Sequence, residues 1–187
     1  MPGVPHALEL LLDPDLEARV RRAWDLLAAA GLPSRARHPH PTNRPHLTLA
    51  MADHLDSGMR AELTAELAAL PLPVCLDGLL VLGARRRTVA WLVVPSTALL
   101  RLHRALHGAV HGAVPATGHG AAGVDPPGPP LLRPDRWVPH VTLASRMSTE
   151  QAGAVVAALG GLSAESGTMT AARFYDTVAR TTMPLHR

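Results

Sequence analysis

Two histidines of this sequence stand in nearly identical surroundings, one in each half of the chain. His46 lies in the segment PHLTLA (residues 45–50), and His140 lies in PHVTLA (residues 139–144). The two histidines are 140 − 46 = 94 residues apart in a chain of 187 residues, which is about half its length. A repeat of that period indicates a duplicated structural unit with one histidine in each copy.

The two motifs have the residue types for acid–base chemistry. Alternate residues of a β-strand point to the same face, so His46 pairs with Thr48, and His140 pairs with Thr142. Imidazole titrates near pH ~6.5, so one ring can accept a proton while the other donates one. A threonine hydroxyl can stabilise an oxygen that gains charge in the transition state. If both strands face one cleft, the four side chains predict concerted catalysis on a phosphodiester; the alternative is a mere folding relic.

Local patterns predict α+β structure around both motifs. The alternation of apolar residues favours strands at residues 7–12, 45–51, 74–82, 88–94, 137–145, 165–175 and 177–183. Capping residues and apolar periodicity favour helices from Pro14 to before Gly31, at about 58–70, from Ser96 to about 114, and from Ser148 to Gly160. Residues 115–135 are rich in Pro and Gly, which predicts a long loop. This order favours two related lobes, each with an antiparallel sheet.

The composition excludes several classes of protein. All 18 basic residues are Arg and the formal net charge is +3, which suits a phosphate-bearing ligand without demanding a nucleic-acid scaffold. Cys75 is the only cysteine, so neither an intramolecular disulfide nor a cysteine-based metal site can form. No apolar run is long enough for a membrane span, and the N-terminus lacks a signal-peptide pattern. We therefore expect a soluble, cytoplasmic protein that has no contact with membranes.

The paired motifs resemble those of the two-histidine (2H) phosphoesterase superfamily, especially its bacterial 2′-5′ RNA ligase-like branch. The likeness covers nearly the whole chain in length, motif spacing and element order. It implies a single bilobal domain over residues 1–187, with pseudo-twofold symmetry, two antiparallel sheets, flanking helices and a central cleft. It also implies an active site that uses no metal and no other cofactor.

The resemblance implies roles for the four motif side chains. His46 would be the general acid that protonates a leaving ribose oxygen, and His140 the general base that activates water. Thr48 and Thr142 would hold the phosphate. The expected reaction is hydrolysis, or in reverse ligation, of 2′,3′-cyclic or 2′-5′ phosphodiesters in nucleotides or RNA ends. We expect a monomer without an obligate protein partner; a nucleotide- or RNA-binding module that turns nothing over is the alternative.

Further residues are candidates for substrate binding. Arg44 and Arg146 lie an even number of residues from His46 and His140, so each shares the catalytic face if its strand extends that far. Many relatives place an Arg at the position of Ser145, one residue before Arg146. Tyr175 is a candidate for stacking on a base, as are two other aromatic residues, Trp137 and Phe174, although Phe174 is better suited to the core.

Two clusters of charged or titratable residues have a simpler interpretation. Arg85, Arg86 and Arg87 are expected at the tip of a hairpin, where a charge run is usually solvated. His103, His107 and His111 recur every four residues on a predicted helix, a spacing that can bind zinc. No carboxylate follows at helical spacing, so a stripe at the boundary of the apolar face is the favoured interpretation.

Overall fold

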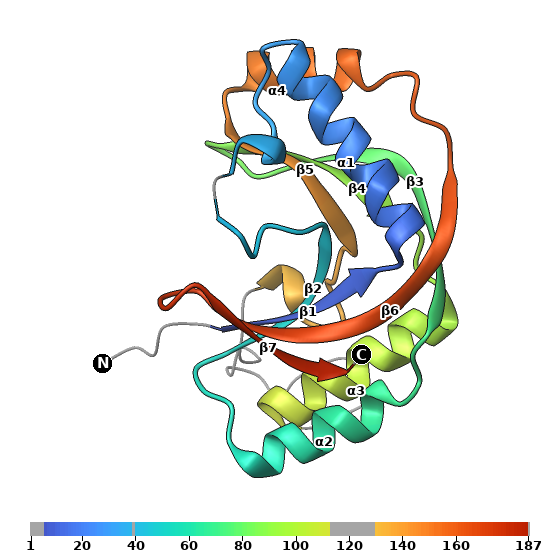
Figure 1. Ribbon diagram of the computed structural model, residues 1–187, viewed down its shortest axis with the longest axis vertical. Coiled ribbons are helices and arrows are strands. Elements are labelled where there is room, and N and C mark those ends of the chain that lie inside the picture. The colour runs from blue at the N-terminus through green and yellow to red at the C-terminus, as the bar shows by residue number, and fades with distance from the viewer. Residues whose placement is uncertain (1–5, 39, 113–129, 187) are drawn as a thin grey trace.

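Seven antiparallel strands and four α-helices make up the part of the chain described by the computed structural model, residues 6–38, 40–112 and 130–186 (Figure 1). The strands are β1 (His6–Leu12), β2 (His46–Ala52), β3 (Leu72–Leu82), β4 (Arg87–Val93), β5 (His140–Met147), β6 (Glu165–Asp176) and β7 (Thr181–His186). The helices are α1 (Pro14–Ala29), α2 (Ser57–Leu67), α3 (Thr97–His111) and α4 (Thr149–Ala158), with short 3-10 helices η1 (Arg35–Arg37) and η2 (Pro130–Leu132).

The sheet has two halves that share its longest strand. Residues 165–169 of β6 pair with β3, whereas residues 169–175 pair with β1 and 172–176 with β7. One half, the first lobe, therefore has the strand order β2-β1-β6-β7, and the second lobe has the order β5-β4-β3-β6. The lobes also meet where Leu47 of β2 pairs with Val141 of β5. The two expected sheets are thus hydrogen-bonded into one, with the motif strands adjacent where the two halves meet.

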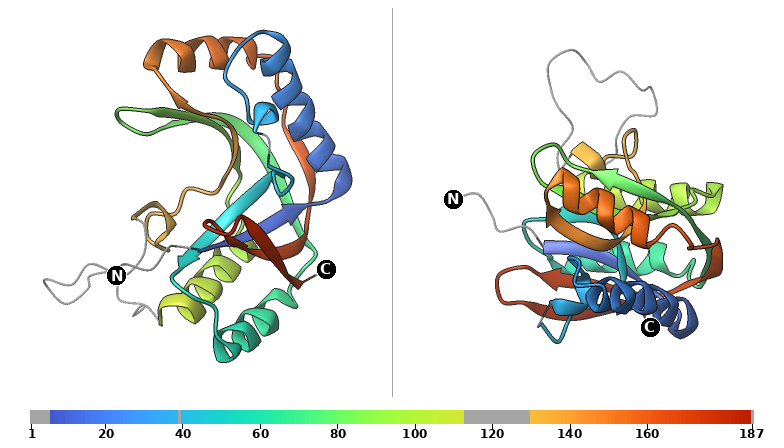
Figure 2. Two further views of the ribbon diagram at one scale, coloured as in Figure 1. Left: turned by 60° about the vertical axis from the view of Figure 1, so that its left-hand side comes forward. Right: turned by 90° about the horizontal axis from the view of Figure 1, so that it is seen from above.

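Each lobe is covered by a pair of helices. Helices α1 and α4 lie together at one end of the molecule and contact β5, and α2 and α3 lie together at the other (Figures 1 and 2). Helix α3 packs against β2 and α1 against β5, so each of these helices covers the lobe that its preceding strand does not belong to. Burial of apolar side chains on both helices stabilises this crossed packing. Helix α1 buries Leu16, Val20, Ala23, Trp24 and Leu27.

Local signals placed most elements correctly. The Asp13 carboxylate accepts a hydrogen bond from the Leu16 amide at 2.8 Å, with Pro14 as first residue of α1, and Ser148 with Gln151 forms the expected capping box of α4. Strand β5 begins at His140, later than expected, and β7 begins only at Thr181. Of the predicted loop at 115–135, residues 113–129 lie outside the described residues, and the segment after them forms η2.

The expected place of the α3 histidines at the boundary of the apolar face is wrong for two of them. His103 and His107 expose 1% and 0% of their surface. His103 stacks flat on Trp137, with ring centroids 3.7 Å apart, and its Nε2 donates to the Leu49 carbonyl at 3.0 Å. The reason is tertiary: β2 and the indole cover this face of the helix.

Within residues 6–38, 40–112 and 130–186, no group of three or more His, Cys, Asp or Glu side chains is arranged to hold a metal ion. No helix in the described part of the chain is long and apolar enough to cross a membrane.

Candidate active site

The register between the motif strands brings the four motif side chains to one face of the sheet. Leu47 lies opposite Val141 in the antiparallel pair of β2 and β5, and both are buried. Opposite residues share a face and sequence neighbours take the other one. His46 and Thr48 therefore project to the same side as the two corresponding side chains of β5, His140 and Thr142.

Each imidazole ring is fixed by a hydrogen bond between its Nδ1 atom and the carbonyl oxygen two residues earlier in the chain. Nδ1 of His46 lies 2.7 Å from the carbonyl oxygen of Arg44, and Nδ1 of His140 lies 2.7 Å from that of Val138. A carbonyl oxygen only accepts, so Nδ1 carries the proton and donates in both rings. The bond leaves Nε2 of each ring for chemistry on the site face.

Two indoles hold the motif strands from behind. Nε1 of Trp137 donates to the Thr48 carbonyl at 3.2 Å, and Nε1 of Trp24 donates to the Thr142 carbonyl at 3.0 Å. Each is a typical hydrogen bond to a backbone acceptor. Trp137 is 8% exposed and stacked on His103, so it supports the motif strand. This burial leaves no ring face free for the predicted stacking on a base.

A β-bulge follows the threonine in both motif strands. In the first lobe Leu8 pairs with Ala50 and Glu9 with Thr48, which leaves Leu49 as the extra residue. In the second lobe the extra residue is Leu143, because Val89 pairs with Ala144 and Ala90 with Thr142. A bulge reverses the alternation of faces beyond it. The even spacing between His140 and Arg146 therefore does not put their side chains on one face. Ser145 lies on the face of His140 instead.

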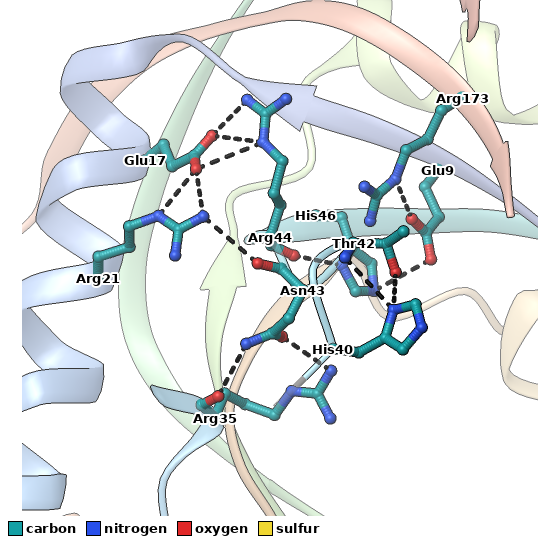
Figure 3. Close-up of polar contacts among 10 residues, drawn as sticks. All are labelled: Glu9, Glu17, Arg21, Arg35, His40, Thr42, Asn43, Arg44, His46 and Arg173. Carbon is teal, nitrogen blue, oxygen red and sulfur yellow. Dashed lines mark hydrogen bonds and ion pairs between the residues drawn. The ribbon is translucent and has the colours of Figure 1, made fainter. Parts of the chain in front are cut away.

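A buried ion pair lies beside His46. Glu9 is 3% exposed; its Oε2 accepts a hydrogen bond from Arg173 Nε at 2.7 Å, and its Oε1 lies 3.4 Å from His46 Nε2 (Figure 3). Burial lowers the pKa of His46; the Glu9 carboxylate and the Arg44 carbonyl oppose this, whereas Arg173 and Arg35 reinforce it. In the sequence, Glu9 is the one charged residue in the apolar run 7–12. A charged residue in a buried strand is a signal of a functional group, but Glu9 lies outside the His-x-Thr motifs from which the site was predicted.

The guanidinium of Arg44 is bound by a carboxylate of α1. Its Nη2 lies 2.5 Å and its Nε 3.0 Å from Glu17 Oε2 (Figure 3). Burial raises the pKa of Glu17, but hydrogen bonds from Arg44 and Arg21 outweigh it, so the pKa lies below its usual range. Strand β2 begins only at His46, so Arg44 lies outside the strand. Its even spacing from His46 therefore does not put the two side chains on one face.

Arg35 is a residue that sequence reasoning missed, and the charge of its guanidinium acts on His46. It lies on η1, where its Nη2 contacts Asn43 Oδ1 at 3.3 Å and Asn43 Nδ2 donates to its carbonyl at 3.0 Å. Burial lowers the pKa of Arg35; Glu9 and Tyr175 oppose this, whereas Arg146 reinforces it. The η1 helix contacts β5, the strand that carries Arg146, so the two guanidiniums lie in the same region of the molecule. No spacing rule connects Arg35 to His46, because the fold of the intervening loop sets its position.

Arg146 has an unusual backbone conformation. Its φ is +61°, in the left-handed region that non-glycine residues rarely adopt, and the register of β5 with β4 shifts at this point. Its side chain is exposed. Such strain often accompanies functional positions.

The face of the first lobe that bears Glu9 and Arg173 also bears Tyr175 and a cavity. Tyr175 lies opposite Ala7 and Thr182, on the same face of β6 as Arg173, whereas Phe174 is 5% exposed in the core as expected. A cavity of about 380 Å³ opens on this face; its lining includes Leu11, Thr42, Arg44, Arg173, Thr182 and His186. It adjoins His46, because Leu11 pairs with His46 across the strands.

The predicted arginine run lies at the hairpin between β3 and β4. Arg85 and Arg86 lie in the turn from β3 to β4 and are exposed as expected, whereas Arg87 is the first residue of β4. Arg87 donates to the Thr149 hydroxyl at 3.3 Å and to the Gly83 carbonyl. The run therefore supports the hairpin and the start of α4.

Comparisons with known proteins agree with this architecture. The chain is similar to E. coli LigT in complex with NADP+, with a TM-score of 0.52 and 15% identity over 98% of this chain and 94% of that one. LigT in its apo form has a TM-score of 0.52 and 14% identity over the same shares. At such identities the likeness shows the fold, an α+β LigT-like arrangement. No curated protein matches by sequence. A family model described as the 2′-5′ RNA ligase superfamily matches residues 12–179, so the chain belongs to that superfamily.

Proposed function

We propose that this protein is a phosphoesterase that opens 2′,3′-cyclic phosphates, or cleaves 2′-5′ phosphodiesters, in nucleotides or RNA ends. The two histidines act as acid and base, and the two threonines with nearby arginines bind the phosphate. The observation that carries the proposal is the common face of the four motif side chains, with both Nδ1 atoms bound to carbonyls and both Nε2 atoms left for chemistry.

The proposed reaction is an in-line displacement at phosphorus. His140 Nε2 takes a proton from water while the water oxygen forms a bond to phosphorus. The bond between phosphorus and the leaving ribose oxygen breaks, and that oxygen takes the proton from His46 Nε2. The product is a phosphomonoester, and the two rings then exchange protons with solvent. Each proton transfer supplies about 10²–10⁴-fold of rate.

The non-bridging oxygens of the phosphate need donors and positive charge. Thr48 and Thr142 lie on the same face as the histidines, and their hydroxyls supply two donors. Arg35 on η1 and Arg146 on β5, two elements in contact, add positive charge, and a guanidinium matches phosphate geometry with paired donors. We assign Arg44 a lesser part, because Glu17 already binds it.

Hydrolysis of a panel of 2′,3′-cyclic nucleotides and a 2′-5′ dinucleotide tests the proposal. Activity should persist in EDTA and show a bell-shaped dependence on pH. His46→Ala and His140→Ala should each lose at least about 100-fold in kcat, and the double variant should lose little more than either, because the two rings act as one unit.

His54→Ala is the matched control, because the side chain of His54 is 72% exposed and its ion-pair contact is with Asp56 at 3.7 Å. Its activity should equal that of the wild type. Full activity of either catalytic variant would refute the mechanism. Tight nucleotide binding without turnover by the wild type would instead identify a binding module.

A further inference from the structure

The two lobes match closely at the site, yet one position differs in charge. In the first lobe Glu9 pairs with Thr48 in β2, and in the second lobe Ala90 pairs with Thr142 in β5. The bulges at Leu49 and Leu143 follow in the same register. Glu9 and Ala90 therefore occupy equivalent positions beside the two imidazole rings, and only one of them is a carboxylate.

The next strands continue this difference. Arg173 of β6 lies opposite Glu9 and donates to its Oε2 at 2.7 Å, whereas Leu80 of β3 lies opposite Ala90. Glu9 and Arg173 expose 3% and 7% of their surface, and Ala90 exposes none. The hydrogen bond from Arg173 fixes the buried carboxylate, so its second oxygen, Oε1, is directed at His46 Nε2 at 3.4 Å (Figure 3).

This geometry distinguishes the two rings by the proton on Nε2. Nδ1 of both rings donates to a carbonyl. Nε2 of His46 faces a carboxylate, an acceptor, so the doubly protonated ring satisfies both of its neighbours. The position equivalent to that carboxylate beside His140 holds the methyl group of Ala90, so the lone pair on His140 Nε2 has no such reason to take a proton.

We propose that Glu9, fixed by Arg173, is a positioning residue that makes His46 the acid, and that Ala90 leaves His140 to be the base. The inference rests on the proposed function and adds the residue that decides which ring does what. At 3.4 Å the carboxylate is an electrostatic neighbour beyond usual hydrogen-bond length, so the Nε2 proton remains available to the leaving oxygen.

Other charged groups also face His46. Arg173 from β6 and Arg35 from η1 oppose protonation, and burial lowers the pKa of the ring. Glu9 is the carboxylate that counters these three effects. Removal of its charge should therefore lower the pKa of His46 further.

Titration of the histidine ring signals by NMR, assigned with His46→Gln and His140→Gln, measures this directly. In Glu9→Gln the pKa of His46 should fall by about one pH unit. Glu9→Asp, which keeps the charge, should restore most of it. Glu9→Gln/Arg173→Gln removes both charges and keeps the test valid if Glu9→Gln alone fails to fold. Its His46 pKa should then lie below that of Arg173→Gln. An unchanged His46 pKa in Glu9→Gln, or an equal shift at His140, would overturn the proposal.

Two substrates add a kinetic readout that a purely structural role would not change. A ribose leaving oxygen needs an acid, whereas a p-nitrophenolate leaving group does not. Glu9→Gln should therefore slow a cyclic nucleotide at least about tenfold and leave a p-nitrophenyl phosphodiester within about threefold. Equal slowing of both substrates would count against a role through His46. If the wild type hydrolyses neither, the proposed function fails, while the NMR result still decides the part about Glu9.

Discussion

Replacement of His107 by leucine should stabilise the protein at neutral pH and make it less sensitive to acid. His107 is 0% exposed on α3, and neither ring nitrogen has a hydrogen-bond partner in the part of the chain that the structure describes. Leaving a buried polar group without a partner costs about 1–3 kcal/mol. Leucine fills a similar volume without that cost, so the free energy of unfolding should rise by an amount of that order.

The acid response follows from two pKa values. Burial, reinforced by His111, lowers the pKa of His107 to about 4, whereas an unfolded chain has a value of about 6.5. As pH falls below about 6.5, the unfolded chain binds a proton that the folded protein does not, so stability is lost. Between about pH 7 and about pH 5 this loss is about 2 kcal/mol, and it levels off below about pH 4.

Urea unfolding followed by tryptophan fluorescence at several pH values checks both parts. His107→Leu should lose about 2 kcal/mol less than the wild type between about pH 7 and pH 5. Some acid sensitivity should remain, because burial also lowers the pKa of His103 to about 4. His54→Leu, on the surface, is the control and should match the wild type. A His107→Leu protein that is less stable at neutral pH, and equally acid-sensitive, would refute the reasoning.

Three further predictions concern the site. Arg146→Gly relieves a φ of +61° and should raise stability by about 1 kcal/mol, measured by thermal unfolding, while KM for a cyclic phosphate rises. Arg35→Ala should raise KM at least about tenfold in steady-state kinetics, and Arg44→Ala less, because Glu17 binds Arg44. Trp24→Phe and Trp137→Phe each remove a donor to a motif carbonyl and should each lower stability by about 1 kcal/mol in urea unfolding.

Each of these has a result that contradicts it. A loss of stability in Arg146→Gly would mean that the left-handed residue is not strained. Equal effects of Arg35→Ala and Arg44→Ala on KM would place both guanidiniums on the phosphate. If either indole replacement leaves stability unchanged, the corresponding hydrogen bond does not help to hold its motif strand.

Much of the fold follows from short-range sequence signals. The Asp13-Pro14 start of α1 and the Ser148–Gln151 capping box depend on residues within one helical turn, so a window of sequence contains their whole cause. The hairpin of β3 and β4 is also local. Strand β7 and the start of β5 were misplaced, because their limits depend on pairing with β6 and β4.

The doubled His-x-Thr motif can be recognised without a structure, because a period-2 strand and a 94-residue repeat are properties of the chain alone. The surroundings of the motif depend on how the chain folds. Pairing between distant strands set the bulges that reverse the phase at Ser145 and placed Glu9 beside His46 but Ala90 in the equivalent position beside His140. A side chain's face and neighbours depend on hydrogen-bond register with a partner strand, which no local pattern encodes.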